Sequence, residues 1–475
     1  MAGGVHSTRY TTPMRIPPRI LDAPGVIILA LCLVAMGVAR AGGLADPFST
    51  TDGIAPYLPC AAAAEESPLT LSRVVDLALC ANPQTREAWA NARAQAAQLG
   101  VAEAAWLPGV DATASAGRSR TNGVSADTRK ESINASWLLF DFGGREAGIE
   151  SARRLLDAAN ATRDATVQAV FLAAVQAYYQ VQGADAALAA ARVSEQAAER
   201  SYLSAQARYK AGSATPADAL QARTAFSQAQ LARIAAEGSA KAALGTLAAT
   251  LGRDAHRPLM LAAAAQTEPP VHFVRDVEAL VAAARRQRPD LRAAGAQVKA
   301  AEAGVDAARA AYLPSLSLGF AAAEQKTDGL PDARTGTFGL TLSVPLFAGF
   351  ATTYKVQAAK AQLEARQAQA EQLRVQVAQD VWNAAQALVT ATESARTTVD
   401  LLASAEQSDK VARGRYESGV GTLLEMLNAQ SALAAARQQR VQALYDWNVA
   451  RAALARAVGD LGPSFIDTLT IGEAK

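Results

Sequence analysis

The chain has 475 residues, of which 50% are hydrophobic but only 5% are aromatic, and its formal net charge at pH 7 is +2. Much of the apolar content is therefore alanine, the strongest helix former, which buries little area per residue. This composition favours long helices in thin layers over a thick globular core. A nearly neutral chain also lacks the basic excess of nucleic-acid-binding proteins, so no nucleic-acid partner is expected.

Residues 1–41 have the three parts of a secretory signal peptide. Arginines precede the apolar run Val26–Val38, and the small-residue site Ala39–Ala41 follows it, which predicts cleavage after Ala41. The alternative is an uncleaved membrane anchor, but this apolar run is shorter than the roughly 20 residues that a spanning helix needs. The sequence therefore favours export across the inner membrane.

Residues 42–68 are rich in Pro, Ala and Gly without any period, and we expect an extended N-terminal arm. Cys60 lies in this arm, and Cys80 lies in the first expected helix. In an oxidising compartment the two thiols can form a disulfide that ties the arm to the helix. Two unpaired cysteines are the equally open alternative.

Residues 69–252 form the first of two expected repeats. Helical composition dominates this stretch, but strict alternation of apolar and small polar residues interrupts it twice. A polar segment, 118–130, separates the two alternating stretches and is expected to be a loop. The expected elements are a helix over 69–106, strands over about 110–117 and 131–140, and helices over 145–211 and 216–251.

Residues 276–459 repeat this order after a Pro-containing linker, 253–275. Matching Pro, Gly and aromatic positions recur at a nearly constant shift of about 207 residues, which indicates an internal repeat. A short tail, 460–475, ends the chain. The expected elements of the second repeat are a helix before Pro314, strands over about 314–321 and 337–346, and helices over 351–413 and 422–458.

One short segment occurs once in each repeat and marks a tight turn between long helices. Arg208–Arg223 has the sequence RYKAGSATPADALQAR, and Arg415–Gln430 has the sequence RYESGVGTLLEMLNAQ. Each contains a Gly that can end one helix and a Thr that can cap the next. We call these two segments the tips.

The expected helix lengths place the tips far from the strands. An uninterrupted helix of about 67 residues is roughly 100 Å long, and the two shorter helices of each repeat together match that length. The economical arrangement stacks the shorter pair end to end beside the long helix. Strands then leave one end of this layer, and the tips lie at the other end.

The four expected strands carry apolar residues on one face and Thr, Ser or Gly on the other. This pattern is typical of a membrane barrel with a wet interior, although a soluble half-buried sheet shows the same alternation. The secretion signal and the few charges on the strands favour the membrane. Four strands cannot close in lipid, and eight leave an interior filled by side chains. Three chains with twelve strands are the smallest set that makes a pore.

The doubled order of helix, YLP-like segment, strand hairpin, PLF-like segment, long helix, RYxxG tip and helix resembles the TolC-like outer-membrane efflux and secretion proteins. The resemblance covers about Leu69–Gly459. It implies a mainly α fold with a small membrane β part, in which a trimeric twelve-stranded outer-membrane barrel continues into a periplasmic α-helical barrel. It also implies export of a protein toxin or of small molecules, together with a periplasmic adaptor and an inner-membrane ABC or other transporter. No residue in the sequence specifies the cargo.

The same resemblance implies that the tips form the periplasmic aperture. In the family archetype, a Tyr, an Arg and two acidic residues of the second tip hold the mouth closed. Here Gly421 occupies the place of the Arg and Asn428 that of one acid, so the archetypal ionic lock is incomplete. Glu425 would form an acidic ring in a trimer and favour cations, although a solvated helix residue is the alternative. The candidate aperture residues are Tyr209, Gly212, Asp218, Tyr416, Gly419, Glu425 and Asn428.

No enzyme motif occurs in the sequence, and no catalytic residue, cofactor or metal is expected. The chain has three His and no P-loop, dinucleotide-binding Gly motif, HExxH segment or zinc-spaced Cys pair. The alternative function is a soluble periplasmic coiled-coil adaptor or structural protein. Such a protein would share the helices but would not need two pairs of alternating strands.

Overall fold

The computed structural model describes residues 46–54, 68–256, 259–262 and 276–461. The chain divides into two compact units, residues 1–50 and 51–475, and all long helices and strands belong to the second. The expected signal peptide, 1–41, lies outside the described residues, as do most of the arm (42–68), much of the linker (253–275) and most of the tail (460–475). A short 3-10 helix, η1 (Thr50–Gly53), precedes the first long helices.

Local capping explains where the helices of the first repeat begin and end. The Thr70 hydroxyl caps the first helix, while the Asn82 side chain caps the second, whose first residue is Pro83. Proline fits there because the first N–H of a helix has no intrahelical partner. The helical elements are α2 (Leu71–Ala81), α3 (Pro83–Glu103), η2 (Ala104–Trp106), α4 (Gly144–Lys210) and α5 (Pro216–Thr250).

The second repeat has the same series of helices. Pro289 again opens a helix directly after a short one, and Gly459, with a φ of 89°, ends the last. The long helix contains no Pro and ends four residues later than the sequence predicted. The helices are α6 (Val277–Gln287), α7 (Pro289–Ala310), α8 (Ala351–Glu417) and α9 (Leu423–Val458).

The four strands form one antiparallel sheet in the order β1-β2-β3-β4, so strands of both repeats pair at its centre. The expected polar loop over 118–130 is wrong, because β1 and β2 continue through it to a two-residue turn. Asn122 and Gly123 both have positive φ, as a type I′ hairpin turn requires. The strands are β1 (Gly109–Thr121), β2 (Val124–Phe140), β3 (Ser315–Thr327) and β4 (Ala333–Ser343).

The register of the sheet places most large apolar residues of the four strands on one face; Leu138, which lies opposite Ser317 beside an irregularity in the β2–β3 register, is an exception. Val110 pairs with Ala135, Ala135 with Phe320, and Phe320 with Phe338. Residues directly opposite each other point to the same face of an antiparallel sheet. The opposite face is polar: Asn134 donates a hydrogen bond of 2.9 Å to the Asp111 carboxylate, and the hydroxyls of Thr113 and Ser132 lie 2.7 Å apart.

Arg145, at the start of α4, links the strands of the first repeat to its helices through hydrogen bonds and a ring contact. The guanidinium donates hydrogen bonds to the carbonyl oxygens of Ala105 and Leu138 and lies over the Trp106 ring, 3.6 Å from its centroid. The second repeat has Thr352 at the corresponding position. There the Tyr312 hydroxyl donates a 2.9 Å hydrogen bond to the Thr353 hydroxyl instead. The two strand–helix junctions are therefore built differently.

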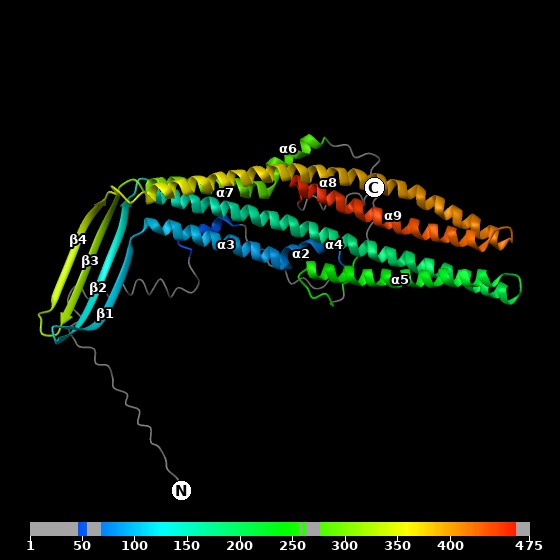
Figure 1. The fold of residues 1–475 in the computed structure, drawn as a ribbon, viewed down its shortest axis with the longest axis horizontal. Helices are drawn as coiled ribbons and strands as arrows, with labels where there is room; N and C mark the ends of the chain where they lie inside the picture. Colours follow the sequence, from blue (N-terminus) through cyan, green and yellow to red (C-terminus); the bar gives the residue numbers. More distant parts are fainter. Residues whose placement is uncertain (1–45, 55–67, 257–258, 263–275, 462–475) are drawn as a thin grey trace, which may run out of the picture. The chain divides into compact units, whose positions relative to one another are not determined.

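The long helices run from the sheet to the tips, as the length argument predicted. In Figure 1 the strands lie beyond one end of α4 and α8, and the α4–α5 and α8–α9 turns lie at the other end. α4 contacts α2, α3 and α5 along its length, and it also contacts α7 and α9 of the second repeat. The largest cores join α2, α4 and α5 in one repeat and α6, α8 and α9 in the other.

Among the helices that the structure describes, none combines the length and the apolar character needed to cross a bilayer.

Candidate functional site: the two helical tips

Both tips end their long helix in the same way. Gly212 and Gly419 have φ values of 73° and 77°, which a residue with a Cβ adopts only at a cost. In the first tip the Ser213 N–H donates to the Arg208 carbonyl oxygen at 2.9 Å. In the second, Val420 N–H donates to the Arg415 carbonyl oxygen at 3.0 Å. These bonds satisfy carbonyls that the helix leaves free, and they define the Schellman motif.

The following helices begin at the threonines that the sequence indicated. Asp218 N–H donates to the Thr215 hydroxyl at 3.3 Å, and the Asp218 carboxylate accepts from the Thr215 N–H at 3.0 Å. This reciprocal pair is a capping box. In the second tip, Glu425 N–H donates to the Thr422 hydroxyl at 3.2 Å. Asp218 thus fixes its own turn.

The two tips pack against each other through one small apolar cluster. Ala205 and Ala222 from the first repeat contact Tyr416, Leu423 and Met426 from the second, and all five side chains are buried. Apolar burial of this kind stabilises contact between the hairpins in proportion to the area removed from water. The cluster therefore holds the α4–α5 turn and the α8–α9 turn together within one chain.

Arg208 covers the buried Tyr416 from the first tip. Its guanidinium carbon lies 4.5 Å from the centroid of the Tyr416 ring, which is within range for a cation–π interaction. Its Nη1 also donates to the Tyr416 carbonyl oxygen at 3.5 Å. Tyr416 is 8% exposed, whereas the equivalent Tyr209 of the first tip is 45% exposed. Of the two predicted tyrosines, only Tyr416 bridges the hairpins in the described residues.

The predicted acidic and amide residues of the second tip lie at its surface. A Glu425 carboxylate oxygen lies 3.7 Å from Arg415, and both side chains are about half exposed. Asn428 is exposed and lines the groove between the hairpins. An ion pair this exposed contributes about 0–1 kcal/mol. The structure thus places Glu425 beside an Arg of its own tip.

Gly421, which occupies the place of the archetypal Arg, has no room for a side chain. A Cβ at this position would lie 2.9 Å from the Arg415 Cβ and 3.1 Å from the Arg415 carbonyl carbon. Its N–H donates to the Arg415 carbonyl oxygen at 3.0 Å, which draws the turn tightly against α8. The corresponding residue of the first tip is Ala214. The second turn therefore has no space for an arginine side chain at position 421, so an ion pair from this position is excluded.

A groove of about 760 Å³ runs between the two hairpins behind the tips and contains a residue that sequence reasoning missed. Asp409 is 7% exposed; one carboxylate oxygen accepts from Arg413 at 2.9 Å, and the other has no partner among the described residues. In the sequence, an Asp four residues before an Arg on a helix indicates an ordinary surface pair. Its burial depends on α9 and could not be inferred locally.

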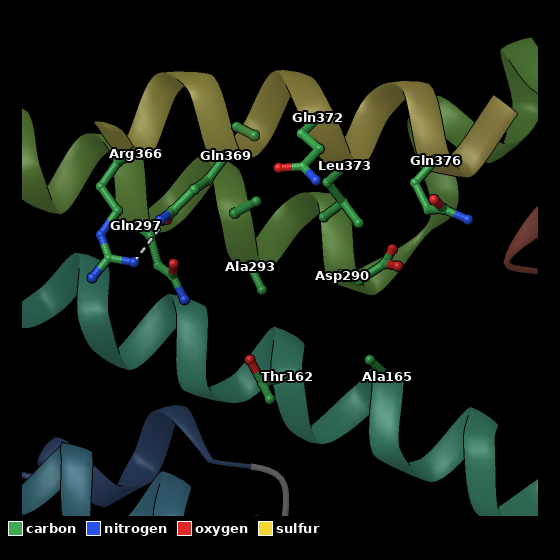
Figure 2. Close-up of a pocket in the computed structure, with 12 residues that line it drawn as sticks. Thr162, Ala165, Asp290, Ala293, Gln297, Arg366, Gln369, Gln372, Leu373 and Gln376 are labelled. Carbon is green, nitrogen blue, oxygen red and sulfur yellow. Dashed lines mark hydrogen bonds between the residues drawn. The ribbon is translucent and has the colours of Figure 1, made fainter. Parts of the chain in front are cut away.

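A second polar groove, of about 470 Å³, lies between α4, α7 and α8 (Figure 2). Four of its lining residues are glutamines, and Arg366 donates to the Gln369 side-chain oxygen at 3.0 Å (Figure 2). Asp290 lies at its edge and binds the Arg288 guanidinium at 2.6 Å. Burial acts to raise the pKa of Asp290, but the hydrogen bonds and charge of Arg288 outweigh it and hold that pKa below its usual range. This groove lies on the helices between the sheet and the tips.

Cys80 is disulfide-bonded in the structure. The predicted partner, Cys60, lies outside the described residues, so the Cys60–Cys80 pairing stays a prediction.

The two repeats also match a known family. Residues 74–253 and 280–460 each match the model of the family described as "Outer membrane efflux protein". The chain belongs to this family. Its members are outer-membrane transport proteins, so the chain is an outer-membrane channel of the efflux and secretion class. This membership overturns the alternative of a soluble periplasmic adaptor.

Curated relatives and solved structures agree with the assignment. The chain is 34% identical to Protein CyaE of Bordetella pertussis over 91% of this chain and 94% of CyaE. It is 29% identical to the outer membrane protein OprJ of Pseudomonas aeruginosa, over 76% and 78% of the two chains. The fold matches the CmeC outer membrane channel of Campylobacter jejuni with a TM-score of 0.73 and 20% identity, over 85% of this chain and 89% of CmeC. The open-state MtrE channel of Neisseria gonorrhoeae matches with a TM-score of 0.70 and 22% identity, over 82% and 89%.

Proposed function

We propose that this chain is the outer-membrane duct of a three-part export system and works as a homotrimer. The observation that carries the proposal is the four-stranded sheet, whose outer strands β1 and β4 each pair on one side only among the described residues. In lipid, every unpaired backbone group costs several kcal/mol, so such a sheet must be completed by other chains. Three copies supply twelve strands, which is enough for an open lumen.

The outward face of the sheet has the composition that lipid requires. Phe338, Leu340 and Leu342 on β4 are all more than 60% exposed, which is costly in water and favourable in a bilayer. Exposed aromatic residues gather where the strands meet the helices, as expected at a membrane–water interface. They are Trp106, Phe140, Phe142, Tyr312, Phe347 and Phe350.

Charged residues gather at the opposite end of the strands, near the hairpin turns. Arg118 and Asp127 face each other there in a two-bond ion pair, and Lys326 lies 3.2 Å from Glu324. Together with the aromatic residues, these charges bound an apolar band of the height that a membrane strand provides. The turns would then lie outside the cell, and the helices would extend into the periplasm.

The tips are the proposed periplasmic mouth of the duct. In place of the archetypal ionic lock, we propose that contact between the two tips of each chain keeps the mouth closed. This contact is made by the buried Tyr416 and by Arg208, whose guanidinium covers the Tyr416 ring. Three copies would place three Glu425 side chains around the opening, each beside its own Arg415. The tips are also where an adaptor and an inner-membrane ABC or other transporter would meet the duct, since the strands occupy the other end.

The proposed cargo is a protein toxin or small molecules. The names of more distant relatives mention antibiotics, toluene and pyoverdine, so membership in the family does not select one cargo. Deleting the gene and comparing both the secreted proteins and the drug sensitivity of the cells would identify the exported class.

The proposal is tested by fractionation followed by mass measurement in detergent. The expected result is a trimer extracted from the outer membrane. A water-soluble monomer in the periplasm would contradict both the membrane location and the trimer.

A further inference from the structure

The free edges of the sheet determine how two copies of this chain join. This inference rests on the proposed trimer and adds the residue register of its seam. β1 and β4 are the outer strands, and neither edge is covered by another described element. The two strands run antiparallel, because each neighbouring pair in the sheet is antiparallel. A β4 edge can therefore extend the sheet by pairing with the β1 edge of a second copy.

The lengths of β1 and β4 allow only a few registers in which β4 of one copy is fully paired with β1 of the next. β1 has 13 residues and β4 has 11. The whole of β4 is paired only if Ser343 lies opposite residue 109, 110 or 111 of the partner. Any other register leaves backbone donors and acceptors at one end of β4 without a partner strand, which is costly wherever water is excluded.

The alternation of apolar and polar residues along both strands excludes the register with Ser343 opposite residue 110. Even-numbered positions of both strands belong to the apolar face, because Val110 is connected to Phe338 through the pairs across the sheet. Placing Ser343 opposite Val110 of the partner subunit would turn every apolar residue of one strand toward the lumen. A shift by one residue always has this consequence in a sheet.

The apolar columns distinguish the two registers that remain. β4 and the residue after it carry a column of four large side chains: Phe338, Leu340, Leu342 and Val344. β1 carries a column of four mostly small ones: Val110, Ala112, Ala114 and Ala116. With Ser343 opposite residue 109, Val344 lies beyond the end of β1. With Ser343 opposite residue 111, the columns match along their whole length, and each bulky residue of Phe338, Leu340 and Leu342 lies beside an alanine.

We propose that β4 pairs with β1 of a second copy in the register that places Thr341 opposite Thr113 of the partner subunit. On the lumen face this register also places Ser343 opposite Asp111 of the partner subunit, whose Oδ2 is already bonded to Asn134 in its own chain. Threonine pairs across strands are stabilising, and a serine hydroxyl can donate a hydrogen bond to a carboxylate oxygen. Pro345, which has no N–H, ends the pairing two residues beyond β4.

Disulfide trapping in isolated outer membranes tests the register. Cysteines at directly opposite positions fall within the Cα separation that a disulfide spans. The variant Thr113→Cys/Thr341→Cys is expected to shift on a denaturing gel from monomer to covalently closed trimer after mild oxidation. The matched variant Thr113→Cys/Gly339→Cys tests the neighbouring register, and the structure leaves free space for a Cβ at Gly339. Thr113→Cys/Thr337→Cys should remain monomeric on the gel, because its two cysteines lie four residues apart along the seam.

The outcomes separate this inference from the proposed function. Stronger trapping of the Gly339 variant than of the Thr341 variant would overturn the register but leave the trimer. A trimer in detergent that none of the three variants cross-links would overturn the β4–β1 seam itself. A monomeric wild-type protein in detergent would overturn the proposed function as well.

Discussion

The two tips share their turn chemistry but differ in what surrounds them. Gly212 and Gly419 end their helices through the same hydrogen bonds, and the hydroxyls of Thr215 and Thr422 each accept from the third N–H of the next helix, although only the first tip completes a capping box. Yet Tyr416 is buried against the other repeat, while Tyr209 remains 45% exposed. Local turn geometry is therefore repeated, and the contacts between repeats are not.

This difference assigns unequal roles to equivalent residues. A turn depends on a few neighbouring residues, so the same sequence gives the same turn twice. Burial of a side chain depends on the residues packed against it from other elements. The two hairpins of one chain pack against each other through one cluster, so only one of the two tyrosines is buried there. The second tip supplies the tyrosine to that cluster, and the first supplies the arginine that covers it.

Removing the buried tyrosine should have the largest effect. Tyr416→Ala empties the centre of the apolar cluster, and large-to-small changes of this kind cost about 3–5 kcal/mol. The matched change Tyr209→Ala should cost less than about 1 kcal/mol, because that ring is half exposed. Amide hydrogen exchange at both tips would show faster opening in the first variant alone. Equal acceleration in both would contradict the asymmetry.

Filling the space at Gly421 should disturb the second turn. In Gly421→Ala the new Cβ meets Arg415 at 2.9 Å, and overpacking typically costs about 1–3 kcal/mol. Ala214→Gly, at the equivalent position of the first tip, serves as the matched control and should leave its turn closed. Hydrogen exchange at Val420 and Gly421 would report the change. A Gly421→Ala variant with unaltered protection would show that the turn can relax at no cost.

Removing the arginine over the buried ring should have a smaller effect. Arg208→Ala loses a cation–π contact that contributes roughly 0.5–2 kcal/mol, depending on its exposure. Arg415→Ala loses an exposed ion pair with Glu425, which contributes about 0–1 kcal/mol. Limited proteolysis of the tips should therefore proceed faster in Arg208→Ala. Faster cleavage of Arg415→Ala would place the closing contact in the second tip instead.

The smallest effect is expected for the proposed acidic ring. Glu425→Gln should lower the cation preference of the reconstituted channel, because negative rings select cations. The effect is limited by Arg415, which lies 3.7 Å from each carboxylate. Asp218→Asn in the first tip is the comparison at an acidic residue that caps its own helix. An unchanged reversal potential for Glu425→Gln under a salt gradient would remove Glu425 from the mouth.

Much of the fold was predictable because its signals are local. Long stretches without Pro predicted α4 and α8 to within a few residues, and alternation predicted all four strands. The expected loop over 118–130 is wrong because charged residues also occur in the ends of strands that project from a membrane, and Asn122-Gly123 is a strong hairpin signal. At the tips, the positions of the turns were predictable from Gly212 and Gly419, which end the long helices, and from Thr215 and Thr422, which cap the next ones. Arg208 and Asp409 were missed because their environments involve residues far away in the chain.

The most direct test of the account is the single-channel conductance of the trimer in planar bilayers, with Tyr416→Ala compared to Tyr209→Ala. If Tyr416 and Arg208 close the mouth within each chain, the wild-type protein and Tyr209→Ala conduct weakly and alike, and Tyr416→Ala conducts more strongly. Equal conductance of all three proteins would contradict the claim that contact between the two tips closes the duct.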